Sequence, residues 1–210
     1  MYTGIVTGTF PVVSLVRKPG LATLVVELDA RHVEGLQTGA SVSLEGVCMT
    51  VTKIDGLRAS FDAAAETLSR TTLGLVKEGA RLNVERSARS GAEIGGHPIS
   101  GHIDAMATIV SLERPENNCV ITFEIPQAYN RYVFNKGFIA LNGCSLTVCD
   151  LDRKTGRFRV FLIPETLRLT TFGTAKVGDR VNFEIDRQTQ VIVDTIQGAV
   201  ENVLGELKLR

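Results

Sequence analysis

The chain has 210 residues and a mass of 22.7 kDa, and 44% of its residues are hydrophobic, which is enough for real cores and excludes a disordered protein. Its 23 basic residues balance 23 acidic ones, so the composition excludes a nucleic acid or an anionic membrane bound through bulk charge. Twenty glycines, six prolines and no Trp favour short strands joined by tight turns. The composition therefore predicts an all-β protein.

The sequence also bears on location and metal binding. Apolar runs stay short of the roughly 18 residues that a membrane span needs, and the opening MYTGIV has no charged secretory region, so we expect a cytoplasmic protein. Its four cysteines, expected to be free thiols because they form no Cys-x-x-Cys pair, are Cys48, Cys119, Cys144 and Cys149. The three histidines lack the spacing of metal ligands, and we expect no metal site.

An internal repeat with a period of 97 to 99 residues organises the chain. The stretch ETLSRTTLGLVKEGARLNVE (66–85) returns as ETLRLTTFGTAKVGDRVNFE (165–184), with eleven of the twenty positions identical. GVCMTV (46–51) returns as GCSLTV (143–148), and TGIV (3–6) returns as SGHI (100–103). Three blocks in one order indicate two copies of one unit of about 90 residues.

Strands with alternating apolar and polar residues follow one another within each copy. In the first copy the apolar positions include Val42, Leu44, Leu82 and Val84, and in the second copy the stretches 158–162 and 181–185 behave in the same way. Because closure removes exposed strand edges, we expect a small closed barrel in each half. The predicted units are 1–96 and 97–189, with Gly-Gly-His-Pro (95–98) at their boundary.

The segment 190–210 has no counterpart in the first copy. From Gln190 to Leu209 its apolar residues recur at alternating steps of three and four, which predicts a helix with an a/d seam; they are Val193, Ile196, Val200, Val203 and Leu207. Such a stripe packs either on the helix's own barrels or on another copy of the helix. Self-association is favoured, because two small barrels offer no obvious groove for so regular a stripe.

The two copies differ at chemically important positions. Cys48 aligns with Ser145, and His102 aligns with Ile5. If both barrels bind the same ligand, they bind it alike but act on it differently, which suits a reaction between two similar molecules. Each residue also has a structural alternative, since Cys48 fits a strand core, His102 fits a structural role, and His97 can cap the turn between the barrels.

Two further groups of polar residues remain ambiguous at this point. The paired threonines either lie in ordinary strands or bind a hydroxyl-rich ligand; they are Thr50, Thr67, Thr147 and Thr166. Lys136, which precedes Gly137, fits either a solvated turn or a binding site.

Along essentially its whole length the chain resembles the riboflavin synthase family of the α-chain type, which has lumazine-binding repeats. The resemblance rests on TGIV (3–6), GVCMTV (46–51), EIGGHPISGHI (93–103), GCSLTV (143–148) and IPETL (163–167). It implies two six-stranded Greek-key barrels, a C-terminal helix at 190–210 that forms a homotrimer, and a transferase. The implied reaction is the dismutation of two 6,7-dimethyl-8-ribityllumazine molecules into riboflavin and 5-amino-6-(D-ribitylamino)uracil, without metal or organic cofactor. The resemblance also makes lumazine synthase a candidate protein partner.

Site residues are carried over by position. The implied catalytic residues are His102 as proton shuttle, and Cys48, or a water it orients, adding to the substrate with help from Ser41. The first barrel's binding residues would be Gly4, Ile5, Val6, Cys48, Met49, Thr50, Asp62, Ala63, Ala64, Ala65, Glu66 and Thr67. Those of the second barrel would be Gly101, His102, Ile103, Ser145, Leu146, Thr147, Phe161, Leu162, Ile163, Pro164, Glu165 and Thr166, with Lys136 reaching across an interface between subunits.

The chain departs from the family pattern at three positions. Tyr2 stands where Phe is common, Glu45 where Asn is frequent, and Asn142 where Asp is typical. A neutral Asn142 could not replace a carboxylate that assists proton transfer. The alternative function is that of lumazine proteins, antennae that bind a lumazine or flavin without turnover, while a flavin-storing protein has no positive support in the sequence. The intact motifs favour the enzyme.

Overall fold

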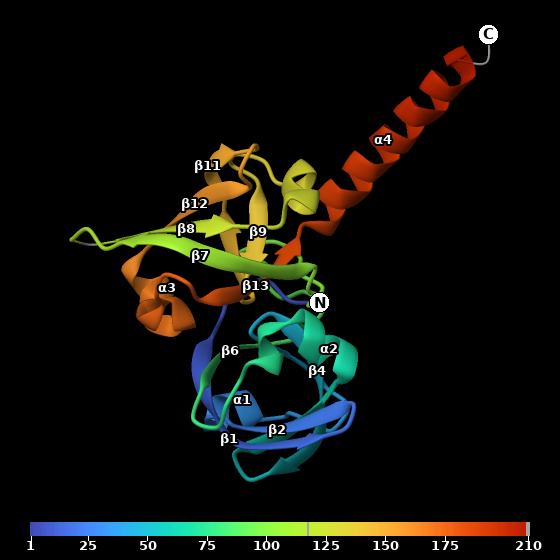
Figure 1. Ribbon diagram of the computed structural model, residues 1–210. Helices are drawn as coiled ribbons and strands as arrows, with labels where there is room; N and C mark the ends of the chain where they lie inside the picture. Colours follow the sequence, from blue (N-terminus) through green and yellow to red (C-terminus); the bar gives the residue numbers. More distant parts are fainter. Residues whose placement is uncertain (117, 209–210) are drawn as a thin grey trace.

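The computed structural model describes residues 1–116 and 118–208, and side chains in the last helix as far as Gly205. Both copies of the repeat fold mainly as strands, and a long helix follows them (Figure 1). Within the described residues, no helix combines the length and apolar character needed to cross a membrane.

The first copy forms a closed antiparallel barrel. Its strands are β1 (Gly8–Lys18), β2 (Leu21–Glu27), β3 (Ser41–Leu44), β4 (Val47–Asp55), β5 (Arg58–Ala64) and β6 (Arg81–Arg86). They pair in the order β1-β2-β5-β4-β3-β6, and β6 pairs with β1 to close the barrel. Short helical segments connect them: α1 (Ala30–Val33), α2 (Ala65–Arg70) and η1 (Thr72–Gly74).

The second copy repeats this plan with one interruption. Its strands are β7 (Ala105–Glu113), β8 (Cys119–Glu124), β9 (Phe138–Leu141), β10 (Cys144–Thr147), β11 (Cys149–Asp152), β12 (Arg157–Leu162) and β13 (Arg180–Ile185). Its short helical segments are η2 (Gln127–Tyr132), α3 (Pro164–Leu169) and η3 (Thr171–Thr174). The sheet order is β10-β9-β13-β7-β8-β12-β11, so this second barrel is nearly closed and not closed as we expected, with β10 and β11 as its edge strands.

The second sheet thus has seven strands and not the six that we expected. The strand that matches β4 is divided at Val148 into β10 and β11, and Asp150 just beyond has a positive φ of 50°. Val148 still donates its N–H to the Gly137 carbonyl at 3.0 Å and accepts from the Lys136 N–H at 2.8 Å. The strand therefore bends without leaving the barrel wall.

Each barrel has its own apolar core, but the segments ahead of the first strands are exchanged. Val6, from the first copy, is buried in the second barrel's core, while Ile103, from the second copy, packs against the first barrel's core. Tyr2 and Ile99 pair as an antiparallel bridge where these two segments pass one another. Because of this exchange, the segment that precedes the first strand of each copy lies against the barrel of the other copy.

The two barrels meet at equivalent turns. Gly46 and Gly143 both have φ near 80°, and a Cβ on Gly46 would lie 2.6 Å from the Gly143 nitrogen, so the contact requires glycine. The Asn83 side chain accepts from the Thr171 N–H at 2.8 Å and donates to the Asn142 carbonyl at 2.9 Å. In the equivalent contact from the other barrel, the Asn182 side chain accepts from the Thr72 N–H and donates to the Glu45 carbonyl. The repeat therefore builds an interface with approximate two-fold symmetry.

Helix α4 (Arg187–Lys208) leaves the second barrel and extends away from both barrels (Figure 1). Its first turns are held by Asp194, which accepts from the Tyr132 hydroxyl at 2.6 Å, and by Val193, which packs on the second core. Farther along, Ile196, Val200 and Val203 are more than half exposed. The predicted Leu207 side chain, Leu209 and Arg210 lie outside the described residues.

Candidate active site

The first barrel presents a polar outer face on β3, β4 and β5. Ser41 lies opposite Thr50, and Ser43 lies opposite Cys48, while the intervening Met49 points into the core. On β5, Asp62 and Ala64 are exposed, and α2 then begins at Ala65 with Glu66 and Thr67 in its first turn. This strand alternation gathers small and hydroxyl-bearing groups on one surface.

The loop that carries His102 reaches this first barrel. The Cys48 N–H donates to the Gly101 carbonyl at 2.9 Å, and a Cβ on Gly101 would lie 2.6 Å from the Cys48 Cβ. The His102 side chain is exposed. The expectation that Gly101 to Ile103 would frame the second barrel is therefore wrong, because the exchanged segments place this loop beside Cys48.

The second barrel's outer face receives the opposite loop. The Ser145 N–H donates to the Gly4 carbonyl at 2.9 Å, so the loop 4–6 lies against β10 and does not frame the first barrel as we expected. Ser145 Oγ lies 2.6 Å from His97 Nδ1, and the His97 ring stacks on Phe138 with 5.1 Å between ring centroids. Burial lowers the pKa of His97, which leaves its imidazole neutral at neutral pH.

Apolar side chains are exposed around this second face. Phe138 lies opposite Thr147, and Phe138, Phe161 and Ile163 are 52%, 49% and 61% exposed. The first turn of α3, with Pro164, Glu165 and Thr166, follows directly. Exposed apolar groups beside hydroxyls are typical of a surface that a ligand or partner covers.

A buried glutamate holds each loop by its backbone. Glu85 accepts from the Thr3 N–H at 2.6 Å and the Gly4 N–H at 3.0 Å, and burial raises its pKa. Glu184 accepts from the Ser100 N–H at 2.7 Å and the Gly101 N–H at 2.8 Å. Sequence reasoning did not assign these roles, although both glutamates stand at identical positions of the repeated block.

Four of the expected binding residues point inward. Val6, Met49, Ala63 and Leu162 are all buried in barrel cores. Period-two alternation turns the three strand residues, Met49, Ala63 and Leu162, away from the outer face, and the segment before β1 carries Val6 into the second core, so only their backbones can line the faces. Lys136 is exposed in the turn before β9, with a positive φ of 65°.

Tyr2 contributes a contact that the sequence did not suggest. Its side chain is buried, its hydroxyl lies 3.2 Å from Cys48 Sγ, and a hydrogen bond with Ser41 lowers its pKa. Burial dominates and raises the Tyr2 pKa well above its usual value, so the hydroxyl keeps its proton and can donate to the sulfur. Tyr2 thus links two of the predicted catalytic residues.

We expect Tyr2→Phe to slow alkylation of Cys48 by iodoacetamide at neutral pH about three- to tenfold, because the thiolate loses a hydrogen-bond donor. The rate is measured by mass spectrometry in a Cys149→Ser background, which removes the other half-buried thiol. An unchanged rate would show that the Tyr2 hydroxyl does not assist the sulfur.

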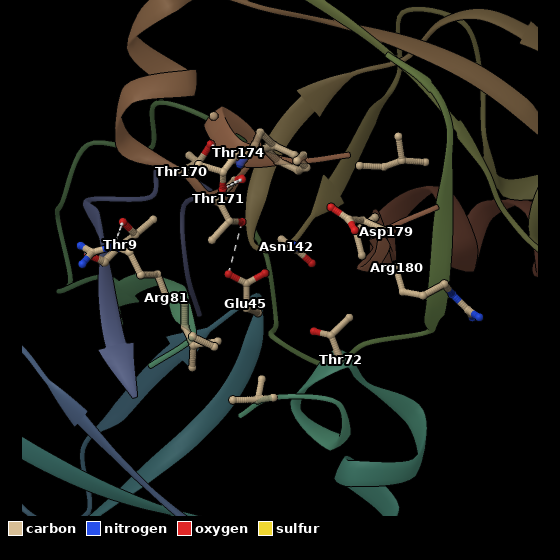
Figure 2. A pocket seen from close by; sticks show the side chains of 18 of the residues that line it. Thr9, Glu45, Thr72, Arg81, Asn142, Thr170, Thr171, Thr174, Asp179 and Arg180 are labelled. Carbon is tan, nitrogen blue, oxygen red and sulfur yellow. Dashed lines mark hydrogen bonds between the residues drawn. The ribbon is translucent and has the colours of Figure 1, made fainter. Parts of the chain in front are cut away.

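Glu45 and Asn142 lie at equivalent turns in the barrel interface. Glu45 accepts from the Asn83 N–H at 2.6 Å, and Asn142 accepts from the Asn182 N–H at 2.7 Å. Both line a cavity of about 790 Å³ between the barrels (Figure 2). Asn142 is therefore part of the barrel interface, and its neutral amide satisfies a backbone N–H there.

Burial raises the pKa of Glu45 to about 8, although the Asn83 N–H and the Thr171 hydroxyl oppose the shift. The folded chain therefore holds a proton that the unfolded chain releases near pH 4.5. Stability must fall as pH rises from the unfolded pKa to the folded one.

We expect Glu45→Gln to flatten this pH dependence. At pH 8.5 the free energy of unfolding of the variant should exceed that of the parent by about 2 to 4 kcal/mol. At pH 5 the two proteins should differ much less. Urea titrations at equal protomer concentration measure the difference, and Asn142→Asp is the matched converse, expected to lose stability with rising pH. Equal pH slopes for parent and Glu45→Gln would contradict the assignment.

The described residues contain no group of three or more His, Cys, Asp or Glu side chains that could hold a metal ion. A family model described as "Lumazine binding domain" matches residues 3–87 and again 100–186. The riboflavin synthase of Escherichia coli (strain K12) is 48% identical over 210 residues, covering 98% of both chains. That of Mycobacterium bovis is 41% identical over 195 residues, covering 89% of this chain and 93% of the relative.

Solved structures resemble the fold. LumP complexed with riboflavin superimposes with a TM-score of 0.83 at 21% identity, covering 89% of this chain and all of that one. LumP complexed with 6,7-dimethyl-8-(1'-D-ribityl) lumazine gives a TM-score of 0.79, covering 88% and 98%.

Two barrels related by a repeat, each with an outer face bordered by the other copy's loop, define a tandem lumazine-binding-domain protein. Within that class, full-length similarity to enzymes of one name is decisive, and the chain belongs to the riboflavin synthase family.

Proposed function

We propose that the chain converts two molecules of 6,7-dimethyl-8-ribityllumazine into riboflavin and 5-amino-6-(D-ribitylamino)uracil by transfer of a four-carbon unit. Membership of the riboflavin synthase family supports this reaction. The observation that carries it is the contact between Cys48 and Gly101, since it brings the loop that carries His102 beside Cys48, and both residues stand at chemically important positions where the copies differ.

Each outer face would bind one lumazine. Thr50 and Thr67 on the first face, and Thr147 and Thr166 on the second, supply hydroxyls for a ribityl chain. The exposed Phe161 and Ile163 supply apolar surface for a flat ring. The two faces therefore offer similar hydroxyls for binding, but the first face has Cys48 where the second has Ser145.

The chemistry divides between the two substrates. One lumazine loses a proton from its C7 methyl group, for which an exposed imidazole at His102 is the suited base. The other accepts a nucleophile at C7, supplied by Cys48 or by a water that Cys48 and Ser41 orient. Holding two ligands face to face contributes up to roughly 7 to 11 kcal/mol in good cases.

A homotrimer would bring the faces together. Both faces are open in a single chain, and α4 extends away from the barrels with an exposed apolar stripe. We therefore place the first barrel of one subunit against the second barrel of the next, with the α4 helices associating. Cytoplasmic location and lumazine synthase as a partner belong to the same proposal, and co-sedimentation with that enzyme tests the latter.

The deciding experiment supplies the purified protein with 6,7-dimethyl-8-ribityllumazine alone and follows riboflavin by absorbance and fluorescence. One mole of riboflavin per two moles consumed is the expected result. Tight binding without turnover would contradict the proposed enzymatic activity and favour the lumazine-protein alternative. The similarity to LumP is a similarity of fold alone.

A further inference from the structure

The loop that carries His102 is held in two layers, of which the first is common to both copies. Glu184 binds the Ser100 and Gly101 N–H groups, as Glu85 binds those of Thr3 and Gly4. Ser100 Oγ also accepts from the His102 N–H at 3.2 Å. Because the first copy has the same arrangement without a histidine, this layer belongs to the scaffold.

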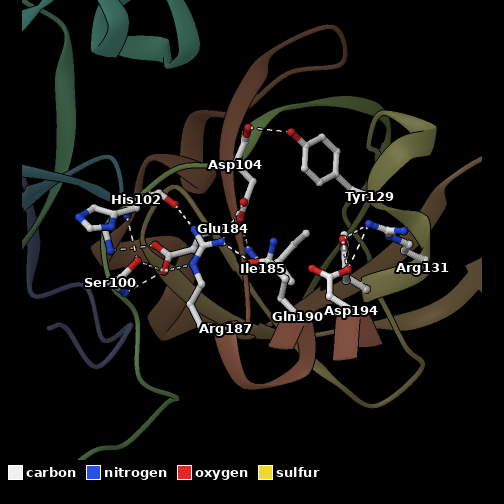
Figure 3. A network of polar contacts seen from close by, with 12 residues as sticks. Ser100, His102, Asp104, Tyr129, Arg131, Glu184, Ile185, Arg187, Gln190 and Asp194 are labelled. Carbon is white, nitrogen blue, oxygen red and sulfur yellow. Dashed lines mark hydrogen bonds and ion pairs between the residues drawn. The ribbon is translucent and has the colours of Figure 1, made fainter. Parts of the chain in front are cut away.

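A second layer is formed by Arg187, the first residue of α4 (Figure 3). Its Nη1 donates to Asp104 Oδ1 at 2.9 Å, and its Nη2 donates to the His102 carbonyl. Its Nε also lies 4.0 Å from Oε1 of the buried Glu184, so the second layer touches the first. The Asp104 side chain is only 11% exposed, and its other oxygen accepts from the Ile185 N–H at 2.8 Å. Arg187 therefore clamps both the residue before Ile103 and the residue after it.

The first copy lacks the chemistry for this clamp. Ile5 stands at the position of His102, Thr7 at that of Asp104, and Ala88 at that of Arg187. An alanine side chain has no donor, and the Thr7 hydroxyl instead lies 2.7 Å from His32 Nε2. The two copies can thus be compared directly: the copy that has the histidine also has the arginine, and the copy without the histidine lacks it.

We propose that Arg187 is a positioning residue for His102, which sets the imidazole over the first-barrel face by holding the His102 carbonyl and, through Asp104, the main chain that follows it. Because Arg187 also begins α4, the same residue connects the proposed proton shuttle to the proposed assembly helix. This inference deepens the proposed function and rests on it for its kinetic consequences, whereas its geometric consequences are independent of turnover.

Three variants separate positioning from support of the fold. Arg187→Ala leaves Asp104 a buried charge without its cation and should lower both stability and kcat. Arg187→Ala with Asp104→Asn removes that charge and keeps an oxygen for the Ile185 N–H, so most of the stability should recover; the part that does not reflects the buried Glu184, which still loses the cation 4.0 Å away. The His102 carbonyl still lacks its donor, and kcat should stay about ten- to a hundredfold below the parent with little change in KM. Arg180→Ala, an exposed arginine at the start of β13, is the matched control.

A readout without turnover keeps this test distinct from that of the proposed function. The chain has only three histidines, so the Hε1–Cε1 signals in 13C-labelled protein can be assigned with single His→Gln variants. In the double variant we expect the His102 signal to shift and broaden, while those of His32 and His97 stay in place.

Each outcome is decisive for the clamp. Full recovery of kcat together with stability, or an unmoved His102 signal, would overturn it and make Arg187 a structural residue. A parent protein that makes no riboflavin would contradict the proposed function, and the His102 signal would still decide whether Arg187 positions the loop.

Discussion

Placing two glutamates in the apolar stripe, as Val200→Glu and Val203→Glu together, is expected to convert the proposed homotrimer into monomers and to lower kcat/KM by at least about a hundredfold. These side chains are 52% and 57% exposed on a helix that extends from the barrels. Charges there oppose helix association, and each barrel face would then lose the face that we place opposite it. Analytical ultracentrifugation and riboflavin formation measure the two effects.

The helix supplies its own control. Gly198 and Gly205 lie on the opposite side of α4, where an added Cβ meets no other atom within 4 Å. Gly198→Glu with Gly205→Glu introduces the same charge and should leave assembly and turnover intact. A fully active monomer of the valine variant would refute the assembled site.

The second large effect is expected at the two residues that distinguish the copies. His102→Gln and Cys48→Ser should each lower kcat by about two to four orders of magnitude, because the proposed general base or the proposed nucleophile is lost while the binding surface stays. The dissociation constant for the lumazine, measured by fluorescence titration, should change less than tenfold.

Cys149→Ser is the control for the thiol, since Cys149 lies on β11 in the other barrel. Equal losses of turnover and of binding in either test variant would make that residue a binding group and not a catalytic one. If both variants turned over nearly as fast as the parent, the positioning of the two ligands would be the main source of the rate enhancement.

Local patterns in the sequence were sufficient for the architecture. Alternation in 158–162 and 181–185 reflects side chains that point to opposite faces of a strand, and this holds wherever the strand lies. The break at Val148 was not predicted, because a bend in one wall of a barrel leaves that alternation nearly unchanged. Likewise, Met49, Ala63 and Leu162 were expected to bind the ligand because they belong to the site motifs, although strand alternation turns their side chains inward.

The sequence by itself determined the duplication, the barrels, the C-terminal helix, and the identity of Cys48 and His102 as chemically important residues that the other copy lacks. Tertiary structure alone decided that the loops 4–6 and 101–103 exchange barrels, which brings the His102 loop to Cys48. It also decided that Tyr2 contacts the thiol and that Arg187 holds the His102 loop. The physical reason is range: strand and helix patterns arise from neighbours along the chain, whereas these contacts join residues 46 and 85 positions apart, and only the packing of two complete barrels brings them together.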